Sequence, residues 1–310
     1  MAPRRGGGGF SSGSSSIGAC SDAGAFESDY VKVLIAFVAF FFLVYSVQLY
    51  MLSKRKKDSK AGWGLLFSSV FLSWVSITMN IVVIPVQECA VIGARDSDSI
   101  SIAISWISGI SALLAVATLM LPILKLVTQS KIVTIVSSAY VVFLAVLWLA
   151  TLAISTRLML GDSYYYGYSR GLFDLARAQR GLIMARNVFM FLGCGFAGVV
   201  MVAQVLRKSH LKQGKTAVML ILMVLFALAY TLLDLAFYIS AVYFGTNTNV
   251  ASLVVTFLSY FFYAGFVGCA MAVIVSPNLT TDRKYPGHIP VAPPTYAPYG
   301  PSYQYVPQNA

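Results

Sequence analysis

Charged residues are scarce in this chain: Asp, Glu, Lys and Arg make up 11% of its 310 residues, where a soluble domain has about a quarter. Histidine and cysteine are also rare, with 2 and 4 copies. No group of His, Cys and acidic residues has the spacing of a metal site, and no nucleophile is paired with a base. We therefore expect no metal, no cofactor and no enzymatic activity. What is abundant is apolar: 58% of the residues are hydrophobic.

Polar faces are missing from seven long stretches of the chain. Each is near or above the roughly 20 residues that a membrane-spanning helix needs. A buried soluble core is excluded, because so many apolar segments would have no side to turn to water. The sequence therefore predicts an all-α, polytopic membrane protein, a seven-transmembrane-helix bundle in contact with the lipid bilayer. The predicted spans are about 31–53, 63–86, 100–122, 132–156, 184–206, 216–244 and 250–276.

Both ends of the chain lack apolar periodicity. Residues 1–30 are rich in Gly and Ser and are predicted to be a disordered extracellular leader, and residues 277–310, rich in Pro and Tyr, a disordered cytoplasmic tail. In that tail Pro293, Pro294 and Tyr296 form a PPxY motif, the ligand pattern of WW domains. A proline-rich segment is already extended and loses little entropy on docking. We expect a WW-domain protein as a partner of the tail.

The basic residues are unevenly distributed, although the net charge of +11 alone could suggest nucleic-acid binding. Every lysine except Lys32 lies in the first, third and fifth loops or in the C-terminal tail. Short loops rich in lysine stay in the cytoplasm. The N-terminus is then outside and the C-terminus inside, in a plasma membrane or endomembrane, and no nucleic-acid partner is expected.

The fourth loop, about 157–183, carries four arginines and is nevertheless assigned to the outside by the number of spans. Its part 172–183 is predicted to form an amphipathic helix at the outer membrane surface. An aromatic interface belt with extended arginines and a lid that grips a ligand are both consistent with this pattern.

Two cysteines, Cys20 and Cys89, lie on the predicted outer side, which is oxidising. A disulfide between them would tie the leader to the second loop, and two free thiols are the alternative. Cys194 and Cys269 lie inside apolar spans and are expected to be small packing residues.

One acid, Asp234, falls inside a hydrophobic span, where ionisable groups are costly and usually face a cavity or a partner. Tyr230 and Tyr238 share its helix face at a spacing of four residues. Arg186, followed by Asn187, lies at nearly the same depth in the preceding span, since the two spans form an antiparallel hairpin. These residues are candidates for a cavity-lining ligand site or for an ion pair that locks the two helices together.

Small and hydroxyl-bearing residues mark several spans. Ser69, Ser73 and Ser76 in the second span and Ser101, Ser105 and Ser108 in the third are expected to let helices approach and hydrogen-bond, with a solute path as the alternative. Residues 193–198 fit the dinucleotide pattern GxGxxG, but they lie within an apolar span with no preceding strand, so helix packing is the expected role.

Seven spans with an outside N-terminus are similar in topology to G-protein-coupled receptors, over about residues 31–276. The rhodopsin-like motif Asp/Glu-Arg-Tyr is absent, since the third span ends with Leu121-Pro122-Ile123, and the seventh span has no Asn-Pro-x-x-Tyr and no lysine for retinal. The resemblance implies a receptor that senses an extracellular ligand and signals through basic inner loops to a G protein. The alternatives are a transporter or lipid exporter that uses Asp234 and Arg186, and a non-transporting membrane organiser that acts through its PPxY tail.

Overall fold

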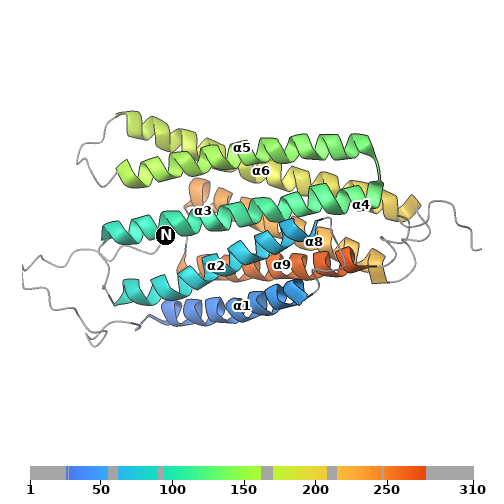
Figure 1. The fold of residues 1–310 in the computed structure, drawn as a ribbon. Coiled ribbons are helices and arrows are strands. Elements are labelled where there is room, and N and C mark those ends of the chain that lie inside the picture. The colour runs from blue at the N-terminus through green and yellow to red at the C-terminus, as the bar shows by residue number, and fades with distance from the viewer. Residues whose placement is uncertain are drawn as a thin grey trace, which may run out of the picture.

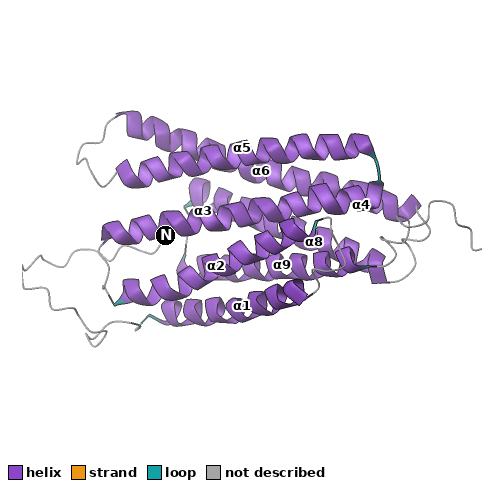
Figure 2. Cartoon of the chain, viewed as in Figure 1, coloured by secondary structure: helices purple, strands orange, loops and turns teal. Residues whose placement is uncertain are grey.

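The structure, a computed structural model, describes residue 26 and residues 28–54, 62–89, 94–161, 170–207, 215–245 and 248–276. This described part is almost entirely helical and contains no strand (Figure 2). The predicted leader 1–30, apart from its last residues, and the predicted tail 277–310, with Pro293, Pro294 and Tyr296, lie outside it.

Seven helices in the described ranges are long and apolar enough to cross a membrane, as predicted. Neighbours in sequence run in opposite directions along the bundle (Figure 1). They are α1 (Asp29–Lys54), α2 (Trp63–Glu88), α3 (Ala94–Thr118) continued by the π-turn η1 (Leu119–Ile123) and by α4 (Leu124–Thr128), α5 (Lys131–Gly161), α6 (Arg170–Arg207), α8 (Lys215–Ile239) continued by the π-turn η2 (Ser240–Phe244), and α9 (Asn249–Val275). The chain is thus a multi-pass integral membrane protein.

The helices form a closed ring in which each packs on the next and α9 returns to α1. The third span is the most enclosed: 67% of its apolar window is buried, against 17–44% in the other six. In Figure 1 it crosses the middle of the bundle, with α5 and α6 on one side and α1, α2 and α9 on the other. The third span therefore contributes side chains to every cavity described below.

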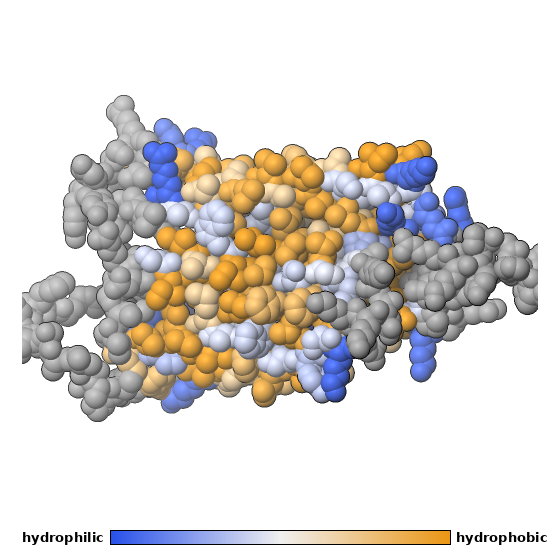
Figure 3. Space-filling view, in the orientation of Figure 1, coloured by the Kyte–Doolittle hydropathy of each residue, from blue (hydrophilic) through white to orange (hydrophobic). Residues whose placement is uncertain are grey.

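The outer surface of the bundle is apolar. On the face shown in Figure 3, hydrophobic residues cover the middle and hydrophilic ones gather at the two ends. Large apolar side chains are widely exposed, such as Ile132 at 74% and Val199 at 71%. Exposing so large an apolar surface to water would be unfavourable, whereas contact with the acyl chains of a bilayer carries little free-energy cost.

The fifth span begins much earlier than expected. The segment 172–183 is not a separate helix at the membrane surface but the first part of α6, which continues unbroken to Arg207. The segment has no proline, and its Leu, Ala, Arg and Gln residues favour a helix, so nothing ends the helix at the predicted boundary. At 1.5 Å per residue α6 is about 57 Å long, well beyond the roughly 30 Å hydrocarbon core.

Pro122 does not end the third span either. It lies within η1, where the Leu124 amide donates to the Leu119 carbonyl, and the helix continues to Thr128. A π-turn suits proline, which has no amide hydrogen to donate. Gly62, just before α2, approaches this turn closely: a Cβ on Gly62 would clash with Pro122 Cβ, and its φ of 89° also favours glycine.

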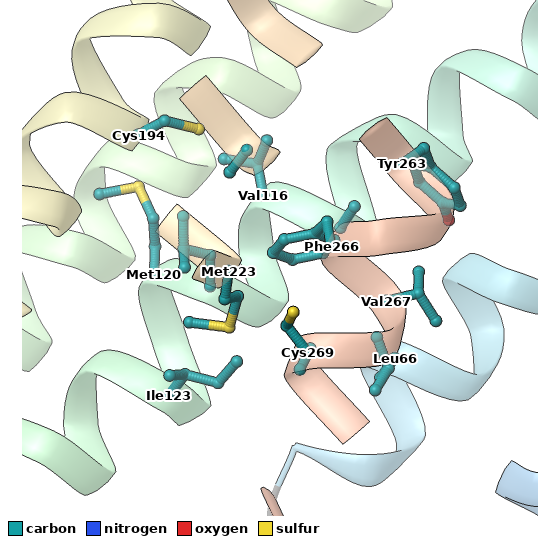
Figure 4. Packing of buried hydrophobic residues seen from close by; sticks show 14 of the residues in the cluster. Leu66, Val116, Met120, Ile123, Cys194, Met223, Tyr263, Phe266, Val267 and Cys269 are labelled. Carbon is teal, nitrogen blue, oxygen red and sulfur yellow. The ribbon is translucent and has the colours of Figure 1, made fainter. Parts of the chain in front are cut away.

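The half of the bundle that contains the end of α1, the start of α2 and η1 is named the inner half, after the predicted orientation. Its interior is a continuous apolar core (Figure 4). Small residues bring the helices together here and nearby, since a Cβ on Gly198 would meet Val224 at 2.6 Å and one on Gly265 would meet Phe226 at 2.9 Å. Fully buried side chains include those of Leu52, Leu66, Leu119, Ile123, Leu124, Met223 and Val273.

Candidate functional site

The opposite half, named the outer half, contains a polar cavity of about 320 Å³ between α3, α5, α6 and α8. We name it the outer cavity. Its wall carries one cation and one acid, Arg186 and Asp234, and two indole rings, those of Trp106 and Trp148. Hydroxyl groups complete the wall, contributed by Ser105, Ser108, Thr151, Ser155, Thr156 and Tyr230.

Arg186 is held in a fixed orientation on α6. Its Nε and Nη2 atoms both donate to Asn187 Oδ1, at 3.0 and 2.9 Å. The guanidinium carbon lies 4.1 Å from the centroid of the Trp148 ring, a cation–π contact that gains strength away from water. Asn187 is buried behind it. The guanidinium therefore presents its remaining N–H groups from a preorganised plane.

Asp234 enters the same cavity from α8. The opposite charges of Arg186 and Asp234 are close enough to interact electrostatically. They form no direct ion pair, because the only contact within 4.0 Å between opposite charges of the described residues joins Lys32 and Asp29. Asp234 also has no hydrogen bond to any described residue. The two charges thus share a cavity without neutralising each other by contact.

Hydrogen bonds between neighbouring helices position the walls of the outer cavity. Trp106 Nε1 donates to Thr156 Oγ1 at 2.9 Å, joining α3 to α5, and Gln179 Nε2 donates to Ser155 Oγ at 2.7 Å, joining α6 to α5. The buried Trp148 Nε1 has no partner among the described atoms. A hydrogen bond thus holds the Trp106 indole, whereas the Trp148 indole is held by packing alone, against Arg186 and next to Gly109.

A second cavity, of about 100 Å³, lies beside the first between α1, α2, α3, α8 and α9. We name it the hydroxyl cavity, because its wall includes Tyr45, Ser73, Ser76, Ser111, Ser259, Tyr260 and Tyr263. It shares Ser108, Ala112 and Tyr230 with the outer cavity. The Tyr230 side chain therefore stands at the boundary between the two.

A cluster of hydroxyls supports the hydroxyl cavity. Ser69 Oγ donates to the Ser111 carbonyl at 2.9 Å and Ser111 Oγ donates to the Ser69 carbonyl at 2.8 Å, a reciprocal pair between α2 and α3. Tyr263 of α9 places its hydroxyl 2.6 Å from Ser69 Oγ and 3.1 Å from Ser111 Oγ. Three helices are joined at this point by side chains that satisfy one another.

The two larger cavities end at the level of Tyr230. A third pocket there, of only about 20 Å³, is lined mainly by apolar residues such as Val116, Leu119 and Phe266, with Tyr230, Thr231 and Tyr263 also at its wall. Figure 4 shows Val116 and Phe266 in the same group of buried side chains as Met120 and Met223. Apolar packing of the inner half begins at this level.

The structure brings three predicted residues, Arg186, Tyr230 and Asp234, to the outer cavity. Asn187 lies behind Arg186, and Tyr238 lies outside the cavity wall and donates to the Arg180 carbonyl at 2.9 Å. Cys89 is disulfide-bonded, and Cys194 and Cys269 are free, so neither is its partner. Cys20 lies outside the described residues.

Sequence reasoning missed Trp106 and Trp148, as well as the hydroxyls of α5. Thr151 and Ser155 are four residues apart, and Trp148 is three residues before Thr151, so all three share one helix face. The face of the fourth span that carries a tryptophan and two hydroxyl residues was therefore the sequence signal that could have placed α5 in the cavity wall.

The cavity is equipped for binding. The described residues include no group of three His, Cys, Asp or Glu side chains that could hold a metal ion. What they offer is a fixed cation, a carboxylate that makes no hydrogen bond to a described residue, hydroxyls and two indole rings. No known protein family, curated protein or solved structure matches the chain.

Proposed function

We propose that this protein is a receptor-like membrane protein that binds a small zwitterionic ligand in the outer cavity and signals through its basic inner loops. The observation that carries the proposal is the pair of opposite charges, Arg186 and Asp234, which line one cavity without contact. A ligand with an ammonium and a carboxylate group would satisfy both at once.

Energetics favour a ligand over a purely structural role. An acid at the centre of a membrane-spanning helix costs about 2.5–3.5 kcal/mol, and Asp234, about 28 Å along α8 from Lys215, lies outward of that centre, so its cost is smaller but still unfavourable. The contact with Arg186 that would offset this cost is not made. Arg186 is instead preorganised by Asn187 and Trp148, so little side-chain entropy is lost when an anion binds. The volume of about 320 Å³ falls within the usual range of small-molecule sites.

The contrast between the two halves supports a receptor in particular. Solute passage requires a continuous polar route, whereas the polar cavities stop at the apolar layer of Val116, Leu119 and Phe266. A ligand in the outer cavity would touch α3, α5, α6 and α8 together, and a change in their packing would reach the basic ends of the helices.

The test is a stability screen on purified full-length protein in lipid nanodiscs, with free amino acids and small aminocarboxylates as probes. We expect at least one zwitterion to raise the melting temperature. Asp234→Asn and Arg186→Gln should each weaken its binding by about 30-fold or more, since each leaves a buried ligand charge unpaired. Tyr238→Phe, on the same face of α8 but outside the cavity, is the matched control.

Two results would contradict the proposal. One is that no zwitterion stabilises the wild-type protein. The other is that Asp234→Asn folds normally and binds the ligand as tightly as the wild type. If a zwitterion does bind in the outer cavity, G-protein activation that depends on the bound zwitterion would identify the signalling partner.

A transporter is the second candidate, and the shared wall at Tyr230 favours it. The outer and hydroxyl cavities meet there, so movement of one side chain would join them into a deeper polar space. Flux of the identified zwitterion into protein-containing liposomes would support transport, and binding without flux would support the receptor. The organiser alternative rests on the PPxY motif, which lies outside the described residues.

A further inference from the structure

The lipid-facing side of α1 and α2 has an open groove of about 360 Å³ in the inner half. It runs between the last turns of α1 and the first turns of α2, and it shares no lining residue with either cavity described above. We name it the α1–α2 groove. Its residues are Ser46, Leu49, Tyr50 and Ser53 of α1 and Phe67, Phe71 and Trp74 of α2. The groove takes no part in the proposed zwitterion site.

One wall of the groove is a row of aromatic rings. Phe67, Phe71 and Trp74 follow one face of α2, because they are spaced by four and three residues. The Phe67 and Phe71 rings are nearly parallel, with an interplanar angle of 4° and centroids 6.4 Å apart, and Phe71 and Trp74 are separated by 6.4 Å at 25°. The row is a smooth apolar surface about 10 Å long.

The ends of the groove differ in polarity. Trp74, at the end nearer the middle of the bundle, is anchored by its Nε1, which donates to Ser46 Oγ at 2.9 Å. At the other end the ammonium of Lys54, the last residue of α1, lies 4.6 Å from the centroid of the Tyr50 ring. Tyr50 is 58% exposed, and its hydroxyl has no partner among the described residues. The groove is therefore apolar inside the membrane and cationic at the membrane surface.

The charge at this end continues in the sequence. Lys54 is followed by Arg55, Lys56 and Lys57, with Lys60 shortly after. Clusters of this kind directly beside a membrane-spanning helix attract anionic lipids of the cytoplasmic leaflet, at about 1 kcal/mol per basic residue. The lysine-rich side is also the side predicted to be cytoplasmic.

We propose that the α1–α2 groove is a binding site for an anionic phospholipid such as phosphatidylserine. One acyl chain lies along Phe67, Phe71 and Trp74, and the phosphate lies beside Lys54 and the Tyr50 hydroxyl. A sterol would use the aromatic row equally well but has no anionic group for Lys54. Charge complementarity therefore selects the phospholipid.

Quenching of tryptophan fluorescence by brominated acyl chains tests the site directly. Full-length protein is placed in phosphatidylcholine nanodiscs that contain increasing fractions of brominated phosphatidylserine or of brominated phosphatidylcholine. The Trp74 signal is the difference between the wild type and Trp74→Phe. Half-maximal quenching of Trp74 is expected at a fraction of phosphatidylserine about fivefold lower than that of phosphatidylcholine.

Variants separate the head-group contact from the chain contact. Lys54→Gln should remove most of the fivefold preference, whereas Lys131→Gln, a lysine at the same end of the bundle, should leave it unchanged. Phe71→Leu should weaken quenching by both lipids, and Phe196→Leu, a similarly exposed ring on α6, should not. Phe71 and Phe196 are both lipid-exposed, at 42% and 44%, so neither change should prevent folding.

Three outcomes would overturn the proposal. Equal quenching by the two brominated phospholipids would remove the head-group preference. Equal effects of Lys54→Gln and Lys131→Gln would show a general surface attraction in place of a site. Stronger quenching by a brominated sterol than by phosphatidylserine would assign the groove to a different lipid.

Discussion

The outer and inner halves of the bundle are built from the same seven helices but are filled differently. In the outer half, hydroxyls, two indoles, Arg186 and Asp234 surround open space. In the inner half, the side chains of Leu119, Ile123 and Leu124 are fully buried, and the pocket that Leu119 borders measures only about 20 Å³. Apolar side chains of the core interlock without voids, whereas polar ones must find partners and so keep the helices apart. The comparison shows how one helix bundle can hold an open, polar-lined cavity next to a closely packed apolar core.

The largest loss of stability is expected for a substitution in the packed core of the inner half. Leu119→Ala removes a fully buried side chain from the inner half and should lower the free energy of unfolding by about 3 kcal/mol, because the space left behind cannot collapse. Reversible unfolding in mixed micelles measures the loss. Leu149→Ala is the control: that side chain is 52% exposed to lipid, which fills the space, and the loss should stay below about 1 kcal/mol. Equal losses would show that the inner half is not tightly packed.

A smaller effect is expected where the outer half is tight. A Cβ on Gly109 would lie 2.5 Å from Trp148 Cζ3, so Gly109→Ala should displace the indole from Arg186 and cost about 2 kcal/mol. The near-ultraviolet circular dichroism of the tryptophans should change with it. Gly195→Ala has no neighbouring atom within 4 Å and should instead stabilise α6, by up to about 1 kcal/mol. Unchanged stability in Gly109→Ala would mean that the Trp148 wall yields freely.

The smallest expected effect concerns the polar contacts that join α2, α3 and α9 beside the hydroxyl cavity. Ser111→Ala removes the hydroxyl that bonds to the Ser69 carbonyl and approaches Ser73 and Tyr263. Hydrogen bonds between membrane helices contribute about 0.6 kcal/mol each on average, so the loss should be about 1 kcal/mol in the same unfolding assay. Ser105→Ala, whose hydroxyl bonds only within its own helix, should cost less. The reverse order would argue against the reciprocal pair.

The sequence was sufficient for the number of spans, because length and apolar content decide whether a helix crosses a bilayer. It failed at the start of α6. Residues 172–183 carry Arg177 and Arg180, so they lack the apolar signal of a span, yet nothing in them ends a helix. Local composition reports the membrane boundary, whereas helix ends depend on capping and breaking residues, and the two need not coincide.

The depth of Arg186 and Asp234 also followed from counting residues back to a turn, since helical rise is constant. Their lack of direct contact did not follow. The Arg186 side chain is directed by Trp148, which comes from a helix that lies earlier in the sequence, and by Asn187. Similarly, Ser69 and Ser111 join helices while Ser105 and Ser108 line the cavity. Serine spacing places residues on a face, but tertiary packing decides what that face meets.

The π-turn η1 changes the angular phase of the third span. Each residue of a regular α-helix advances the chain by about 100°, so one extra residue in a turn rotates everything after it by about that angle. Ala112, which lines all three cavities, and Lys125, near the inner end, therefore lie on the same rod on either side of this offset. If the extra residue were absorbed into a regular helix, Lys125 would rotate about the helix axis and also move along it by about 1.5 Å. The π-turn η1 therefore sets the rotational position of the basic end of this span relative to the part that lines the cavities.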